Sequence, residues 1–463
     1  MLNTPHWQRA GARPEPFVAG EKSRPLQLIV CDDELGSSPA LGLLSSFAAR
    51  RGPLAFVSPS GAVGGRIKIA FDQSEIEYSF KGGRETCVFV YGDWWKRLGP
   101  EEAARAGVDA STLERRFLLA HEASTRDWID GLVMPFDEVL RDRWKNLLSK
   151  AGLMTAESAA ALMGLYLRAC GERMIEIEPP GVGIMVSEER MYLLGALAFL
   201  PRYEMLHEAA GEIWRQSGDP TLAGLADAIA VRLGRALKAR DYMHMRRRAP
   251  NVREIWSDVL YFFESLLVCL QGALDAAARF VHELFELKGP CKRANWGRED
   301  WWRQLERSKA PAGEFDRGCF KDLDLLVGEL RNSIHGEVLT SELRQRVRPG
   351  ETPKLMGYSQ LAVALESEVA VAVSAAAKRR RGLGRWSIRP TLPDGAALVD
   401  PWHYSEAAIV TVADALSSVI EALASHVFSD VVLNPKAQEL WLGREAQRAN
   451  AGILFGLEHL PAP

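Results

Sequence analysis

Hydrophobic and polar positions divide the chain into a short strand-rich segment and a long helix-rich remainder. Short apolar or alternating runs bounded by turn residues predict strands. These runs lie at 26–31, 54–58, 66–71, 75–80 and 86–91. The pair around "DQS" predicts a hairpin, and a helical pattern fills 39–50. Residues 26–110 are therefore expected to form a small α/β unit.

From residue 111 onward, apolar residues recur at three- and four-residue spacing, which predicts helices. The clearest helix follows Pro250 and carries an a/d seam that must pack against partner helices, in the chain or across a dimer. The seam residues are Trp256, Leu260, Phe263, Leu267, Leu270, Leu274, Ala277, Val281 and Leu284.

The expected fold class is α+β, mostly α: a small N-terminal α/β domain, a helical region and a C-terminal helical bundle. The predicted boundaries are an irregular tail at 1–25, the α/β domain at 26–110, the helical region at 111–250, the helical domain at 251–430 and an extension at 431–463.

Composition narrows the function only a little. With 57 basic and 60 acidic residues, the overall charge of the chain does not indicate nucleic-acid binding, so such a role must rest on a local basic patch. The N-terminus lacks the apolar core of a signal peptide, and no run approaches the roughly 18 apolar residues of a membrane span. We therefore expect a cytoplasmic protein with no membrane partner.

Motifs for common cofactors and metals do not occur. The cysteines lack C-x-x-C spacing, which favours buried free thiols, and there is no P-loop, H-E-x-x-H, G-x-S-x-G or dinucleotide fingerprint. No cofactor and no metal site is expected from these patterns. Carboxylates at Asp32, Asp33 and Asp93 follow predicted strands and could hold Mg²⁺, but acidic strand ends are more often simply solvated.

Two basic segments have ordinary structural explanations. Arg246, Arg247 and Arg248 end a predicted helix, where cations are favoured by the helix dipole. The segment "KGPCKRANWGREDWWRQLERSKAP" interleaves cations with tryptophans, which could stack on bases. Packing of the rings against the bundle, covered by arginine stems, is the favoured interpretation.

The segment "ELRNSIHGEVL" carries the strongest candidate chemistry. Arg331 and His335 are four residues apart and share one helix face, beside the apolar stripe that runs through Leu330 and Ile334. A histidine can move a proton at a ribose 2′-hydroxyl or a leaving oxygen, and an arginine can neutralise the phosphorane. Asn332 can orient either group. Each half-site has one histidine, so full acid–base work would need two, from a dimer.

A long helix, a Trp-bearing insertion and a helix with "LRNSIHGE" together resemble the HEPN superfamily over about residues 252–430. The resemblance implies an all-α, typically dimeric domain, often a metal-independent endoribonuclease of defence or stress systems that acts on RNA. Arg331, Asn332 and His335 match the family's Arg, polar and His positions. The family places four to six residues between Arg and His, whereas three intervene here.

Two other interpretations stay open. In the first, the domain is a catalytically silent interaction or sensing module, in which Arg331 and His335 make structural hydrogen bonds. In the second, the acidic strand ends form a metal-dependent site. Asp275 and Arg279 on the long helix could face the Arg331 site, but a surface salt bridge between them is the preferred interpretation.

Overall fold

Two compact units divide the chain, one comprising Met1–Val186 with Ile453–Pro463 and the other Ser187–Gly452. The computed structural model describes residues 26–31, 38–48, 54–58, 67–72, 75–80, 83–88, 99–125, 130–134, 152–177, 182–247, 252–332, 342–344, 355–358, 363–365, 367–380, 388–390, 397–431 and 445–457. The predicted tail at 1–25 lies outside these residues. The fold is α+β and mostly helical, as predicted.

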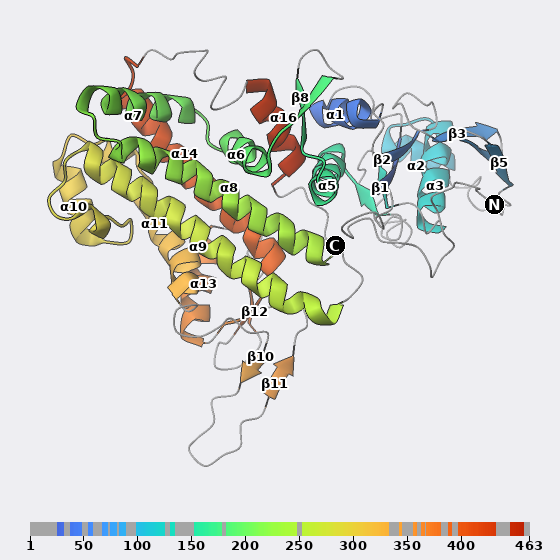
Figure 1. The fold of residues 1–463 in the computed structure, drawn as a ribbon. Helices are drawn as coiled ribbons and strands as arrows, with labels where there is room; N and C mark the ends of the chain where they lie inside the picture. The colour runs from blue at the N-terminus through green and yellow to red at the C-terminus, as the bar shows by residue number, and fades with distance from the viewer. Residues whose placement is uncertain are drawn as a thin grey trace. The chain divides into compact units, whose positions relative to one another are not determined.

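In the described part of the first unit, a seven-stranded sheet has the order β5-β4-β3-β2-β1-β6-β7. Strands β3, β2, β1, β6 and β7 run parallel, and β4 and β5 extend the sheet antiparallel (Figure 1). The strands are β1 (Leu26–Val30), β2 (Leu54–Ser58), β3 (Ile67–Asp72), β4 (Glu75–Phe80), β5 (Gly83–Val88), β6 (Gly131–Val133) and β7 (Leu153–Met154). The helices are α1 (Pro39–Ala48), α2 (Gly99–Ala106), α3 (Ala110–Thr125) and α5 (Ala156–Ala169).

The predicted strands of this unit are present, and the 67–80 hairpin is confirmed. Strand β1 is apolar at every position except Gln27, as expected of a central parallel strand covered on both faces, and Ile29 and Val30 are fully buried. Strand β5 begins at Gly83, three residues before the predicted start. The start of β5 is set by its pairing with β4, in which Gly83 lies opposite Phe80, and not by the start of its apolar run.

Four strands lie in the region predicted to be entirely helical. They are β6 and β7 of the large sheet and the hairpin of β8 (Met174–Ile177) and β9 (Val182–Met185). Each is too short to carry a recognisable period of two residues, so the surrounding helical pattern hid it. The α/β unit consequently extends beyond residue 110.

The first unit also includes the end of α16 (Glu445–Phe455), a helix within the segment predicted as an extension. Arg168 of α5 donates from Nη1 to the carbonyl of Leu454 at 3.0 Å, and its guanidinium lies 4.0 Å from the centre of the Phe455 ring. Gly164 permits this close packing, because a Cβ there would lie 2.1 Å from the Leu454 oxygen. Residues far apart in sequence therefore complete one core.

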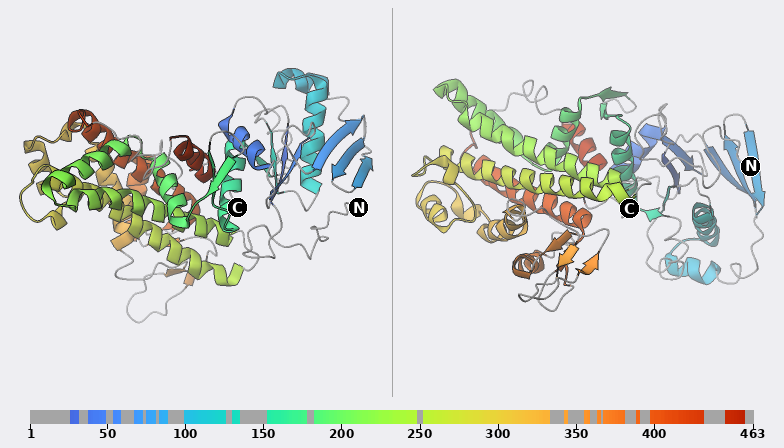
Figure 2. Two further views of the ribbon diagram at one scale, coloured as in Figure 1. Left: turned by 45° about the horizontal axis from the view of Figure 1, so that its top comes forward. Right: turned by 60° about the horizontal axis from the view of Figure 1, so that its bottom comes forward.

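The second unit is a helical assembly in which α8, α9 and α14 run side by side (Figures 1 and 2). Its helices are α6 (Glu188–Ala198), α7 (Tyr203–Ser217), α8 (Thr221–Arg247), α9 (Val252–Leu284), α10 (Glu299–Arg307), α11 (Arg317–Leu323), α13 (Ser367–Arg379), α14 (Pro401–His426) and the first part of α16. Short turns are η2 (Cys291–Arg293), η3 (Ala312–Glu314) and η4 (Asp324–Glu329). Short strands are β10 (Glu342–Arg344), β11 (Leu355–Tyr358), β12 (Val363–Leu365), β13 (Ile388–Pro390) and β14 (Ala397–Val399).

The seam of α9 packs within the chain, against α8 and α14. Its central positions from Phe263 to Val281 are buried, as the heptad pattern predicted. Neighbouring positions such as Leu266 and Phe280 are buried too, because α9 has helices on more than one side. The seam therefore does not need a second copy of the chain to cover it.

Two helices are long and apolar enough to cross a membrane by length and composition alone, contrary to the expectation that no segment approaches this. They are Ser257–Leu284, with mean hydropathy 1.4, and Pro401–His426, with mean hydropathy 1.7. In the structure, 56% and 72% of their most apolar windows are buried against other parts of the protein. A core helix of a helical bundle passes the same test.

A buried polar network joins α8 to its neighbours. Arg240 donates from Nε to Glu406 Oε1 at 2.5 Å, and His244 Nε2 lies 3.1 Å from the same oxygen. Tyr192 of α6 donates its hydroxyl to Asp241 Oδ2 at 3.1 Å. Breaking such a network by removing one partner is strongly destabilising, so it fixes how α6, α8 and α14 align.

Candidate functional site

The segment after α9 is anchored by tryptophan. Trp296 donates its indole N–H to the carbonyl of Leu274 at 2.8 Å and stacks on Phe320, with ring centres 3.9 Å apart. Trp301 and Trp302 are also buried, and Arg317 lies over the Trp302 ring at 5.5 Å. The packing interpretation of this segment is thus confirmed, and these rings are not available to stack on bases.

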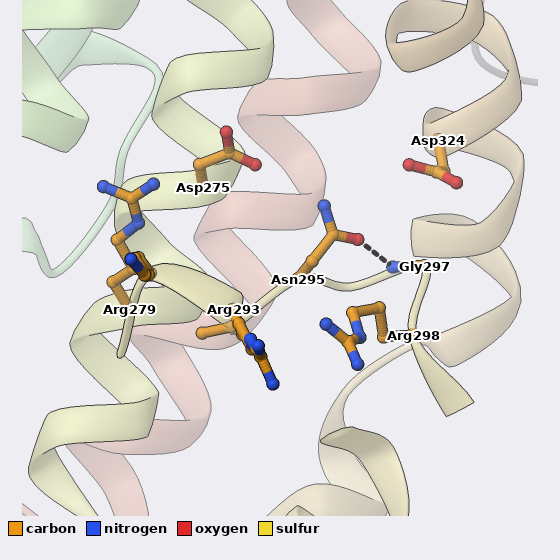
Figure 3. Close-up of a pocket in the computed structure, with 9 residues that line it drawn as sticks. Asp275, Arg279, Arg293, Asn295, Gly297, Arg298 and Asp324 are labelled. Carbon is orange, nitrogen blue, oxygen red and sulfur yellow. Dashed lines mark hydrogen bonds between the residues drawn. The ribbon is translucent and has the colours of Figure 1, made fainter. Parts of the chain in front are cut away.

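The anchored segment forms one wall of a pocket of about 420 Å³. The opposite walls come from α9 and from the first residue of η4 (Figure 3). The pocket is lined by Asp275, Arg279, Lys292, Arg293, Ala294, Asn295, Gly297, Arg298 and Asp324. Cationic and carboxylate side chains thus share a single depression on the helical unit.

The cations of the pocket are mostly unpaired. Among the described residues, the side chains of Arg279, Lys292 and Arg293 have no hydrogen-bond or ion-pair partner, and the Nε of Arg279 is buried. Asp275 accepts from the Gln271 amide at 2.9 Å instead of pairing with Arg279, so the surface salt bridge preferred from the sequence is absent. Arg298 differs from the other pocket cations in having a partner among the described residues, namely Asp300.

Asp324 is the least satisfied carboxylate in the pocket. Within the described part of the chain, its side chain has neither a hydrogen-bond donor nor a cation as partner. Two glycines make room for it, because a Cβ would lie 2.5 Å from its Oδ2 at Gly297 and 3.1 Å from its Oδ1 at Gly328. Burial raises the pKa of the Asp324 carboxyl, and the charges of Glu329 and Asp275 raise it further.

Asp324 also begins a π-helical turn, η4, in the middle of an otherwise α-helical element. Such a turn disturbs the regular backbone hydrogen bonds and occurs frequently at functional sites. The carbonyl of Leu326 accepts a hydrogen bond from the buried hydroxyl of Tyr404 at 2.5 Å. The predicted apolar stripe of this element is confirmed as far as Leu330, and Leu326 joins it in the core.

The residues predicted to be catalytic lie just beyond η4. Arg331 is partly exposed, and its Nη1 donates to Asn332 Oδ1 at 3.3 Å. No carboxylate pairs with Arg331 among the described residues. His335 lies outside the described residues, so its position on the face of Arg331 stays a prediction.

The carboxylates of the metal-dependent alternative, Asp32, Asp33 and Asp93, also lie outside the described residues. Among the residues that the structure describes, no group of three or more His, Cys, Asp or Glu could hold a metal.

The sequence pattern indicates the cation-rich segment but does not indicate the pocket. Tertiary packing brings Asp324 into the same pocket as Lys292, Arg293 and Asn295. No local sequence pattern predicts that arrangement. The two glycines beside Asp324 were the one sequence signal, and neither stands in a recognised motif.

No protein-family model, curated protein or solved structure matches the chain. An unpaired cationic wall facing carboxylates suits a ligand that carries an anion and, close to it, hydrogen-bond donors.

Proposed function

We propose that the second unit is an HEPN-like ribonuclease that cleaves single-stranded RNA without a metal ion. Arg331 contacts the scissile phosphate and stabilises the charge of the phosphorane. His335 acts as general acid or base, and Asn332 orients Arg331 through their hydrogen bond.

The observation that carries this proposal is the state of Arg331. Arg331 is partly exposed, and among the described residues its guanidinium bonds the Asn332 amide and pairs with no carboxylate. A neutral partner orients the guanidinium and leaves its charge for an incoming phosphate. The unpaired cations of the pocket, which precede Arg331 on neighbouring elements, add to the attraction for a polyanion.

Acid and base catalysis together need two histidines, and one copy of the chain offers one in the motif. We therefore include a homodimer of the helical unit in the proposal. Tyr261 and Val268 support it, since they lie seven residues apart on one face of α9 and are both exposed large apolar side chains.

The test is cleavage of end-labelled single-stranded RNA by purified protein in EDTA. The variants are Arg331→Ala, His335→Ala and, as a matched control, Arg303→Ala, which removes an exposed arginine of α10 that does not line the pocket described above. We expect wild type and Arg303→Ala to leave cyclic-phosphate ends. His335→Ala should be slower by about 10²–10⁴-fold, the usual effect of losing a general acid or base. Arg331→Ala should be slower by about 10²–10³-fold, the usual effect of losing a group that stabilises transition-state charge.

Inert wild-type protein, or equal rates for Arg331→Ala and Arg303→Ala, would contradict the proposal. Circular dichroism of each variant separates lost chemistry from lost folding. If the folded protein proves inactive, the catalytically silent interaction module becomes the better description. The three-residue spacing between Arg331 and His335 would then be the natural explanation.

A further inference from the structure

The exposed surface of α8 carries two cations that have no partner. Helix α8 runs beside α9 (Figure 1). Among the cations of α8 whose side chains the structure describes, Lys238, Arg240 and Arg246 each pair with a carboxylate. Arg232 and Arg235 are exposed and make no ion pair or hydrogen bond within the described residues. These two charges are therefore available to a partner.

Both guanidinium groups lie close to α9. A Cβ at Gly272 would collide with the Arg232 guanidinium, so the lack of a side chain at Gly272 makes room for Arg232 across the helix. Burial raises the pKa of the Cys269 thiol, and the charges of Arg235 and Arg232 oppose that rise, which places both cations near Cys269. An arginine that already rests on a helix loses less conformational freedom when it binds a partner.

Exposed apolar side chains border these cations. Tyr261 and Val268 of α9 are 64% and 44% exposed, and they share one side of the helix with Gly272 at spacings of seven and four residues. Val231 is 40% exposed and lies one turn before Arg235 on α8. Large exposed apolar side chains that gather on one surface mark an interaction site. We call this surface the α8–α9 face, made of Val231, Arg232, Arg235, Tyr261 and Val268.

The partner that suits this face is an amphipathic helix with carboxylates. A helical surface has no free backbone groups for strand addition, whereas a second helix can pack its side chains against it. The valines favour an apolar protein surface over a nucleic acid, since a valine neither stacks on a base nor binds a phosphate.

The spacing of the side chains defines the pattern of that helix. Tyr261 and Val268 are about 10 Å apart along the axis of α9, which matches apolar residues one heptad apart. Arg232 and Arg235 match two carboxylates three or four residues apart, with which arginines form charge-assisted hydrogen bonds.

We propose that the α8–α9 face binds an acidic amphipathic helix of a partner protein, with apolar residues on Tyr261 and Val268 and carboxylates on Arg232 and Arg235. Tyr261 and Val268 also belong to the homodimer contact proposed above, so the bound helix competes with the second copy and lowers cleavage of RNA. This regulatory consequence rests on the proposed function, whereas the binding itself does not.

Binding is measured by fluorescence anisotropy with the full chain at low salt and two labelled three-heptad peptides, each stapled into a helix. Both peptides carry leucine at the apolar positions of every heptad. The flanking positions are glutamate in the acidic peptide and lysine in the basic peptide. We expect the basic peptide to bind at least tenfold more weakly than the acidic peptide. Val268→Ser should weaken binding of the acidic peptide severalfold, because an apolar contact is lost.

Charge reversal locates the site. The double variant Arg232→Glu/Arg235→Glu should prefer the basic peptide, a result that general unfolding would not produce. Arg232→Gln/Arg235→Gln should bind the two peptides about equally, without added repulsion. Arg303→Glu, the control on α10, and Arg331→Ala should both keep the wild-type preference.

The proposal is overturned if the acidic peptide does not bind at submillimolar concentration, or if charge reversal leaves the preference unchanged. Binding of a hexaribonucleotide that Arg232→Gln/Arg235→Gln abolishes, without binding of the acidic peptide, would assign the face to RNA instead. Loss of a homodimer in that variant, again without peptide binding, would assign the two arginines to the second copy.

Sedimentation equilibrium tests the competition. A saturating concentration of the acidic peptide should convert the homodimer into a complex of one chain and one peptide. A dimer that persists with the peptide bound would refute the competition. A chain that is monomeric without the peptide would refute the homodimer, and binding of the acidic peptide would still support the proposed helix site.

Discussion

Replacing Asp322 with alanine should destabilise the helical unit far more than an ordinary ion-pair deletion. Asp322 lies in α11, and its side chain is only 6% exposed. Its Oδ1 accepts from Arg379 Nε at 2.8 Å, and its Oδ2 accepts from Arg380 Nε at 2.8 Å. Arg379 is the last residue of α13 and Arg380 follows it directly, so one buried carboxylate links α11 to the end of α13.

The magnitude follows from burial. Removing one partner of a buried ion pair usually costs about 3–5 kcal/mol, because it leaves a charge without compensation. Arg379 is 54% exposed and can be rehydrated, whereas Arg380 is 17% exposed and, among the described residues, keeps Asp316 at 3.4 Å as its remaining carboxylate. We therefore expect a loss of about 2–4 kcal/mol. In a unit of this size that lowers Tm by roughly 5–15 °C.

The assay is thermal unfolding followed by circular dichroism, with Asp258→Ala as the matched control. Asp258 pairs with Arg246 at 3.0 Å, and both side chains are about half exposed. Such a pair contributes about 0–1 kcal/mol and is screened by salt. The effect of Asp322→Ala should persist at 0.5 M NaCl. Equal Tm losses for the two variants, or loss of the difference in salt, would refute the argument from burial.

Three further changes have defined outcomes. Asp324→Asn should raise Tm at neutral pH. Because the pKa of Asp324 is raised in the folded state, the stabilising contribution of its protonated carboxyl is present at acid pH and is lost as pH rises through that pKa. If the Tm of the variant depends on pH between 4 and 7 in the same way as the wild-type Tm, the result counts against this argument. Gly164→Ala should destabilise the first unit by about 1–3 kcal/mol, since the new Cβ meets a backbone oxygen at 2.1 Å, whereas Gly42→Ala, with open space around it in α1, should be neutral or stabilising in the same denaturant titration. Tyr404→Phe should lose about 1–3 kcal/mol in that titration, because the Leu326 carbonyl in η4 is left without its donor; an unchanged midpoint would mean that water replaces the hydroxyl.

Long periodic elements were predictable from the sequence because their burial repeats many times. The seam of α9 and the apolar length of α14 each report one buried face over several turns. Strands such as β6 could not be found this way. Its residues 131–133 are buried, but the pairing partner that makes them a strand, β1, lies a hundred positions earlier in the chain.

Part of the candidate site was predictable from local sequence patterns, and part of it was not. Arg331 and Asn332 were found because their chemistry is local, and the structure adds their hydrogen bond. The pocket joins Asp275 of α9 to Asp324 through the intervening turn, and no spacing rule links them. The π-helical turn was equally hidden, since Leu323, Val327 and Leu330 fit an ordinary α-helical period.

The packing of Arg168 against Leu454 and Phe455 has a consequence for how the protein is made. Residues 187–452 are synthesised between the two parts of the first unit. At about 5–20 residues per second, the ribosome needs roughly 10–50 s to cross that interval. During this time the surface of α5 that receives Leu454 stays open on the nascent chain. The first unit therefore begins folding before the second unit is made, but completes its core only after the second unit has been synthesised. A chaperone that binds exposed apolar helices can act during that interval.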